Sequence, residues 1–245
     1  MKSIKFFAVA AMMAIATSAS AQFSTAQSSS SSSTTNTDGW SSFWVEWNPS
    51  TLKYDKKGLD DSSVSGFSIG YSQAFSIAAS TPLFVEAGLG VQYTFSTLDL
   101  EDDDDTVLNS LFWMCLANDD HGNFDEDDDE DPTFNMFSVK VPVNLIYKFD
   151  LPNSTVSLMP FVGAVARYNL SAQMSYDKQD YDIFDKKDVG SSKATAKRFQ
   201  MGWQIGLKAR LGESFIAGVS YGSDFSEISK DVKVSTTTLS IGYTF

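Results

Sequence analysis

The segment LFVEAGLGVQYTF, residues 83–95, alternates between two kinds of side chain at every step. Every odd-numbered residue from Leu83 to Phe95 is apolar, whereas the even-numbered positions include Glu86, Gln92 and two glycines. A period of two is the period of a β-strand, because successive side chains point to opposite faces of a sheet. We therefore expect a strand with one wholly apolar face and one face of small and polar groups.

The same two-faced pattern recurs along the chain after Trp40 and predicts eight strands. They lie near residues 40–48, 63–77, 82–96, 134–149, 155–171, 196–210, 214–224 and 232–245. Long connections (49–62, 97–133, 172–195, 225–231) alternate with short ones (78–81, 150–154, 211–213). An up-and-down barrel with tight turns on one rim and large loops on the other produces this rhythm, as in outer-membrane barrels.

The composition of the two faces indicates which of them points outward. A soluble eight-stranded barrel places apolar side chains inside and polar ones outside. Here the polar face carries glycines and a few charges, which suit a narrow interior, while large aliphatic and aromatic residues suit contact with lipid. Aromatic residues also gather near the strand ends, where a membrane girdle is expected. In lipid every backbone polar group needs an internal partner, so the sheet must close. The predicted fold is all-β: an eight-stranded antiparallel up-and-down transmembrane β-barrel.

The N-terminus carries the features of a secretory signal peptide. Lys2 and Lys5 precede an apolar run at residues 6–16, and small residues stand at Ala19 and Ala21. This order predicts a signal peptide at residues 1–21, which exports the chain through the inner membrane to the outer membrane. The run is too short for a spanning helix, which needs about 20 apolar residues. Residues 22–39 are rich in serine and predict a disordered leader, followed by the barrel at residues 40–245.

The negative charge of the chain belongs to one segment. Residues 99–131 contain 15 carboxylates and no Lys or Arg, so removing them changes the net charge from −13 to +2. The predicted long loop 97–133 is therefore strongly acidic, and the barrel is nearly neutral. We expect no nucleic-acid partner, because no basic stripe is present to neutralise phosphates.

Two further motifs carry a resemblance to a known family. They are the segment GLGVQY at residues 88–93 and the terminal segment SIGYTF at residues 240–245. With the signal peptide, they make residues 40–245 similar to the eight-stranded outer-membrane barrels of the outer membrane protein beta-barrel domain family, common in Bacteroidota. The long acidic loop is not a feature of that family.

The resemblance also implies partners. The terminal row Leu239, Ile241, Tyr243 and Phe245 looks like the signal that the barrel assembly machinery reads during biogenesis. We further expect contact with outer-membrane lipid, a monomeric state, and a surface ligand whose identity the sequence does not give.

Five charged residues fall on the predicted inward face: Glu46, Glu86, Lys140, Arg167 and Lys208. Buried charges must be paired or they cost several kcal/mol. Eight strands enclose only enough room for side chains. This charged network therefore predicts a closed, ion-paired core, with a gated pore for small solutes as the alternative.

The sequence offers little for catalysis or for a cofactor. Enzymes among small outer-membrane barrels use His with Ser, Asp or Glu near the outer rim, and the sole histidine here, His121, lies in the acidic loop. Cys115 lies in an apolar island without a nearby base, so we interpret it as a buried hydrophobe. We expect no catalytic residue and no cofactor.

The acidic runs raise the possibility of loose divalent-cation binding at Asp102, Asp103, Asp127 and Asp128, because hard cations favour carboxylate oxygens. The spacing of an EF-hand loop is missing, and a solvated, self-repelling tract is the alternative. We expect no dedicated metal site.

Three functional hypotheses follow. The first is a non-enzymatic surface protein whose barrel anchors acidic loops, with a structural or surface-interaction role. The second is a small, low-conductance porin. The third, a lipid-modifying enzyme, has the weakest support because it needs a Ser/His pair.

Overall fold

The computed structural model describes residues 39–54, 61–78, 81–97, 132–176, 179–185, 196–228 and 232–245. The predicted signal peptide, almost all of the predicted leader and residues 98–131 of the acidic loop lie outside these ranges. Among the described residues, no helix is long and apolar enough to cross a membrane.

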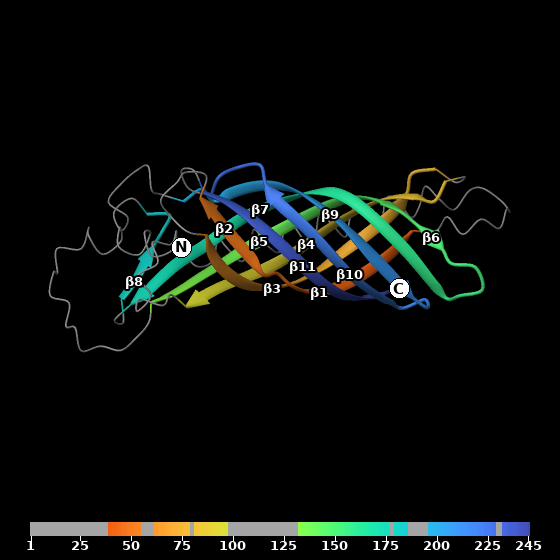
Figure 1. Cartoon of the computed structure of the whole chain (residues 1–245), viewed down its shortest axis with the longest axis horizontal. Coiled ribbons are helices and arrows are strands. Elements are labelled where there is room, and N and C mark those ends of the chain that lie inside the picture. Colours follow the sequence, from red (N-terminus) through yellow and green to blue (C-terminus); the bar gives the residue numbers. More distant parts are fainter. Residues whose placement is uncertain are drawn as a thin grey trace, which may run out of the picture.

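The described residues form one antiparallel sheet that closes on itself (Figure 1). Its strands are β1 (Trp40–Trp47), β2 (Ser50–Tyr54), β3 (Ser62–Ser76), β4 (Leu83–Thr97), β5 (Thr133–Tyr147), β6 (Phe149–Asp150), β7 (Val156–Tyr176), β8 (Gln179–Asp182), β9 (Phe199–Leu211), β10 (Phe215–Asp224) and β11 (Val232–Thr244). β1 pairs with both β3 and β11, which closes the ring. β2 continues β1, β6 continues β5, and β8 adds to β7, so the described residues make a ring of eight strands. The predicted fold class is confirmed.

The first strand of the ring is longer than the sequence pattern predicts. Residues 49–62 were expected to form a connection, but β2 continues the register of β1 without a shift: Trp47 pairs with Phe67, and Thr51 pairs with Ser63. The strand is interrupted at Asn48 and Pro49; the Asn48 N–H still donates to the Gly66 carbonyl at 2.7 Å, whereas Pro49 has no N–H to donate. Its carbonyl still accepts a hydrogen bond of 2.9 Å from the Thr237 N–H. The prediction of a connection from residue 49 is therefore wrong as far as Tyr54.

Three other strand boundaries differ from the prediction by more than one residue, and one of them is the start of β9, at Phe199 instead of residue 196. β7 extends to Tyr176, beyond the expected end at residue 171, and β8 pairs with this extension inside the expected connection 172–195. β5 is interrupted at Lys148, whose N–H donates to the Pro82 carbonyl at 2.8 Å, and β6 then pairs with β7. The extension of β7 pairs with β8, which the side-chain alternation does not reveal, whereas β6 keeps the register of β5 against β7.

The pairing registers define the geometry of the barrel. One row of paired residues leaves β1 at Ser41 and returns to the same ring strand at Thr51, ten residues further on. The row runs through Ser41, Gln73, Ala87, Val143, Ala164, Trp203, Ser223, Ser235 and Thr51. Eight strands with this stagger tilt by roughly 45° and leave an interior that side chains can fill.

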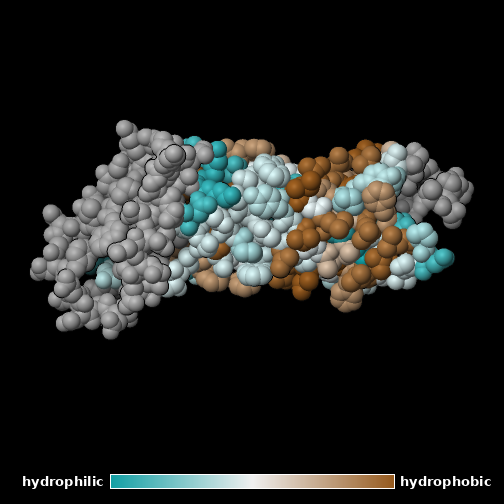
Figure 2. Space-filling model, in the orientation of Figure 1, coloured by the Kyte–Doolittle hydropathy of each residue, from teal (hydrophilic) through white to brown (hydrophobic). Residues whose placement is uncertain are grey.

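The two faces of the strands behave as the alternation predicts. On β4, Glu86, Gln92 and Thr94 are buried inside, whereas Tyr93 and Phe95 are exposed on the outside. Exposed aromatic rings meet on the outer surface at both ends, with Phe43 next to Phe245 at one end and Phe67 next to Phe95 at the other. Figure 2 shows hydrophobic residues gathered on the outer surface toward the end of the barrel that holds the C-terminus and the short turns.

Candidate functional site

The barrel interior has three layers along its axis. A polar middle layer lies between two clusters of buried apolar side chains, one at each end. The cluster at the short-turn end contains Trp40, Ala74, Phe84, Ile146, Met159, Phe161 and Ile216. The cluster at the long-connection end contains Leu52, Val64, Phe134, Met136, Ala172, Met174, Ile183, Ile228, Val232 and Val234. The sequence analysis expected a polar interior and did not distinguish these end clusters, because their members share the inward parity of the polar residues.

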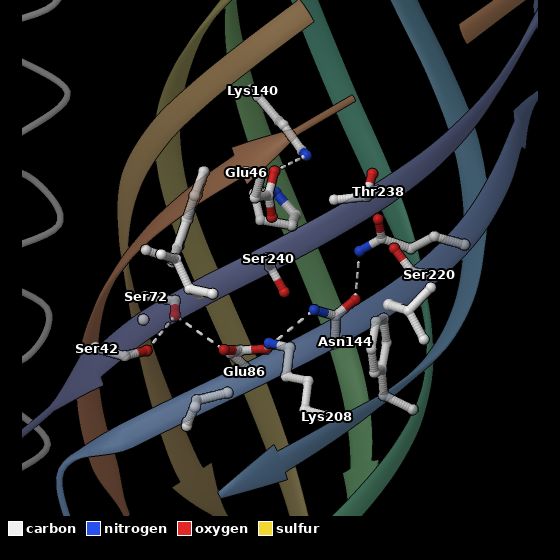
Figure 3. Close-up of a pocket in the computed structure, with 18 residues that line it drawn as sticks. Ser42, Glu46, Ser72, Glu86, Lys140, Asn144, Lys208, Ser220, Thr238 and Ser240 are labelled. Atoms are coloured by element: carbon white, nitrogen blue, oxygen red, sulfur yellow. Dashed lines mark hydrogen bonds and ion pairs between the residues drawn. The ribbon is translucent and has the colours of Figure 1, made fainter. Parts of the chain in front are cut away.

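Glu86 on β4 is a central acceptor of the polar layer (Figure 3). Its carboxylate lies 2.5 Å from the Lys208 Nζ and accepts hydrogen bonds from Asn144 Nδ2 at 3.0 Å and Ser72 Oγ at 2.8 Å. Gln204 Nε2 in turn donates to Asn144 Oδ1 at 2.6 Å. Side chains of β3, β4, β5 and β9 are thus connected across the lumen.

A second ion pair joins β1 to β5. Lys140 Nζ lies 2.6 Å from Glu46 Oε2, and their side chains are 7% and 15% exposed. Ser68 Oγ also donates to Glu46 Oε2, at 2.8 Å. The ammonium group of Lys140 lies 5.6 Å from the centre of the Trp44 ring, a distance at which the face of the ring attracts a cation.

The third ion pair joins Arg167 on β7 to Asp224 at the end of β10. The sequence analysis named Arg167 but missed Asp224. The five predicted residues contain three cations and two carboxylates, an imbalance that indicates a further buried acid. Asp224 has the inward parity of β10 and could have been found by that criterion. In the structure the five predicted residues and Asp224 thus form three separate ion pairs.

Trp44 lies between the Glu46–Lys140 and Glu86–Lys208 pairs, and it fits there because the neighbouring residues Gly70 and Gly90 have no side chains. A Cβ atom added to Gly70 would lie 2.3 Å from Trp44 Cζ2, and one added to Gly90 would lie 2.4 Å from Trp44 Cη2. Real Cβ atoms do not approach other atoms so closely. Close packing against Trp44 therefore requires glycine at both positions. This explains Gly90 in the GLGVQY motif of β4.

Small cavities remain within the polar layer. One of about 40 Å³ is lined by both the Glu46–Lys140 and Glu86–Lys208 pairs, and another of about 20 Å³ is lined by Lys140 and the Arg167–Asp224 pair. A buried water needs roughly 10–15 Å³ of this kind of volume. These spaces match single waters or small groups of waters and do not form an open channel.

The other predicted site residues lie away from this interior or outside the described residues. Leu239, Ile241, Tyr243 and Phe245 form an exposed outward row on and just after β11, with Ile241 68% exposed. Asp102, Asp103, Asp127 and Asp128 lie outside the described residues, as do Cys115 and His121. Within the described ranges, no group of three His, Cys, Asp or Glu residues could hold a metal ion.

A closed ring of eight tilted strands, with a filled interior and an apolar, aromatic-rimmed exterior, defines a transmembrane β-barrel. The family model of the outer membrane protein beta-barrel domain matches residues 7–245, and the chain belongs to this family. It is therefore an outer-membrane β-barrel protein.

Comparison with curated proteins gave no match. Several solved barrels are similar to the chain. The attachment invasion locus protein Ail of Yersinia pestis, in complex with the heparin analogue sucrose octasulfate, is 19% identical, with 85% of this chain and 99% of that chain covered and a TM-score of 0.43. Neisserial surface protein A is 17% identical, covering 83% and 95%, with a TM-score of 0.41. A major outer membrane protein of Thermus thermophilus is 14% identical, covering 84% and 99%, with a TM-score of 0.42.

Proposed function

We propose that this protein is a non-enzymatic outer-membrane barrel whose closed body anchors acidic surface loops for a structural role or for contact with external partners. The observation that carries the proposal is the interior: three ion pairs lie between two apolar clusters. A passage for solutes would have to break these pairs and also hydrate both clusters. Such a body serves as a rigid membrane anchor.

The loop chemistry supports a role at the surface. The segment 99–131 carries 15 carboxylates without a cation, on a barrel that is otherwise nearly neutral. Both ends of this segment attach to strands at the long-connection end, which faces outward in outer-membrane barrels. A partner for such a loop would carry positive charge, and electrostatic attraction would raise its association rate at low salt. The proposal also states that the barrel is of the type common in Bacteroidota and that the protein is a monomer.

The absence of enzymatic activity also belongs to the proposal. The chain has a single histidine, in the acidic loop, so a histidine base would have to come from that loop. Each of the described interior carboxylates, Glu46, Glu86 and Asp224, faces a cation. A general base needs access to substrate, and these groups are held in ion pairs inside the sheet.

Loop presentation is tested by pull-down and glycan screening with the intact barrel in nanodiscs. The matched control is a variant in which residues 98–131 are replaced by a short Gly/Ser linker. Capture of a surface partner by the wild type and not by the control supports the proposal. Equal capture by both proteins would remove the acidic loop from the function.

A second candidate, a gated small-solute porin, is favoured by one observation. Two of the interior cavities share Lys140, Gln204, Ser220 and Thr238 among their lining residues, so they adjoin along the barrel axis. Planar-bilayer recordings of the refolded protein discriminate between the candidates. The anchor proposal expects no single-channel steps in symmetrical salt, whereas reproducible steps that change with Lys140→Gln would favour the porin.

A further inference from the structure

A row of aromatic residues marks the membrane interface at the short-turn end of the barrel. The row crosses β10, β11, β1 and β3, and its paired residues are Phe215, Tyr243, Phe43 and Tyr71. Neighbouring rings meet edge to face, with 5.8 Å between the centroids of Phe215 and Tyr243 and 5.4 Å between those of Phe43 and Tyr71. Aromatic girdles of membrane barrels lie at the level of the lipid headgroups.

The next outward row toward the short turns contains two polar residues, Ser41 and Gln73. The Ser41 N–H donates to the Phe245 carbonyl at 3.1 Å, the Phe245 N–H donates to the Ser41 carbonyl at 3.0 Å, and Ser41 pairs with Gln73. Ser41 has the outward parity of Phe43, and Gln73 has that of Tyr71. Both polar side chains are half-buried on the outer surface. A polar group there is unfavourable unless it has a hydrogen-bond partner.

Ser41, Tyr71 and Gln73 satisfy one another through three oxygen atoms, which we call the polar triangle. Ser41 Oγ donates to Gln73 Oε1 at 2.5 Å. The Tyr71 hydroxyl lies 2.8 Å from Gln73 Oε1 and 3.0 Å from Ser41 Oγ. The two hydroxyl hydrogens are therefore used inside the triangle. The Phe245 ring, 6.4 Å from the Tyr71 ring, packs beside it. The triangle holds the amide of Gln73 with its oxygen turned toward the two hydroxyls.

The amide nitrogen of Gln73 is left to bind a group outside the barrel. Within the described part of the chain, the hydrogen bonds of the Gln73 side chain use Oε1 and not Nε2. An amide nitrogen carries two donors and no acceptor. The complementary group must therefore be an acceptor. Gln73 of a second copy does not fit, because two amides that pair reciprocally each need a free oxygen, and this oxygen already faces two hydroxyls.

We propose that Gln73 Nε2 binds the ester carbonyl of a glycerophospholipid in the periplasmic leaflet, which the short turns face in this class of barrel. An ester carbonyl accepts hydrogen bonds and cannot donate them, and it lies between the headgroup and the acyl chains, at the depth of the aromatic row. The donor is an uncharged amide, whereas phosphate is commonly bound by Arg or Lys. The rings of Tyr71 and Phe245 offer apolar surface to the acyl chain. The site lies beside the seam of β1 and β11 and does not depend on the acidic loop.

Competition between two lipids that differ only in the carbonyl tests the proposal. The intact barrel, refolded in detergent, is mixed with equal amounts of diester phosphatidylethanolamine and its diether analogue, which has the same headgroup and chain length but no carbonyl. Native mass spectrometry counts the bound lipid of each mass. Gln73→Met keeps the length of the side chain and removes the donor. Gln173→Met, at an exposed outward glutamine of β7 near the long-connection end, is the matched control. Heat-modifiable migration verifies that each variant is folded.

The wild type and Gln173→Met should retain the diester lipid about fivefold better than the diether lipid, which is the effect of roughly one neutral hydrogen bond. Gln73→Met should retain the two lipids equally. Equal retention of both lipids by the wild type would overturn the proposal, and so would a preference that persists in Gln73→Met. A wild-type dimer that Gln73→Met converts to a monomer would overturn it in favour of a protein interface. The acidic loop takes no part in this test, so the result is independent of loop presentation.

Discussion

Breaking the Arg167–Asp224 pair should destabilise the barrel far more than breaking an ion pair at its rim. The side chains are 9% and 1% exposed, and the described residues give Arg167 no other ion-pair partner. Asp224→Ala therefore leaves a buried guanidinium without its counter-charge, which costs about 3–5 kcal/mol. Replacing both side chains by apolar ones, as in Arg167→Met with Asp224→Leu, should restore most of that loss, because no buried charge remains.

The free energy of unfolding is measured by urea titration of the refolded barrel in detergent, followed by tryptophan fluorescence. The control is Asp150→Ala, which breaks the Lys148–Asp150 pair, 3.2 Å long with Asp150 66% exposed; it should cost about 0–1 kcal/mol. A hydrogen bond from Ser157 lowers the pKa of Asp150, so its small contribution is present at neutral pH and is lost as the pH falls through the folded-state pKa. The titrations are therefore run near pH 8. Additive effects of the Arg167 and Asp224 substitutions, without a coupling energy, would refute the reasoning.

Four further predictions follow from the fold. The mature protein should fractionate with the outer membrane and migrate faster on gels before boiling, because a closed barrel has no free edge; an unshifted periplasmic protein would contradict this. Protease added to whole cells should cut within residues 98–131 and leave the turn at 151–155 intact, and cleavage at that turn would invert the topology. Phe245→Asp should strongly reduce insertion in cells and have a milder effect on refolding in detergent, since its folded-state cost near the interface is about 0–1 kcal/mol; wild-type insertion would show that Phe245 is not an assembly signal. Gly90→Ala should lower the free energy of unfolding by about 1–3 kcal/mol through overpacking against Trp44 and the Ile69 carbonyl, and adding Trp44→Ala should remove only the part of that increment that is due to the Trp44 ring.

The alternation of side chains was sufficient to predict the class of fold. A period of two places Tyr93 outside and Glu86 inside whatever the neighbouring strands are, because the pleat alone decides the direction of each side chain. The alternation of long and short connections predicted the up-and-down order of the strands, as in outer-membrane barrels. Parity also put five charged residues on the inward face, and in the structure each of them lies in an ion pair.

Distances across the lumen and around the ring required the tertiary structure. Pairing of Arg167 with Asp224 depends on the stagger of the strands, which no single strand encodes. The continuation of β1 through Pro49 depends on neighbours on both sides that keep the register. The height of a residue along the barrel axis also follows from its neighbours: Ser235 on β11 lies in one row with Trp203 on β9 only because of the registers of three adjacent strands. The sequence thus determines which way each side chain points, and the closed, tilted ring determines how deep it lies and what it meets, because depth and contact are properties of several strands together.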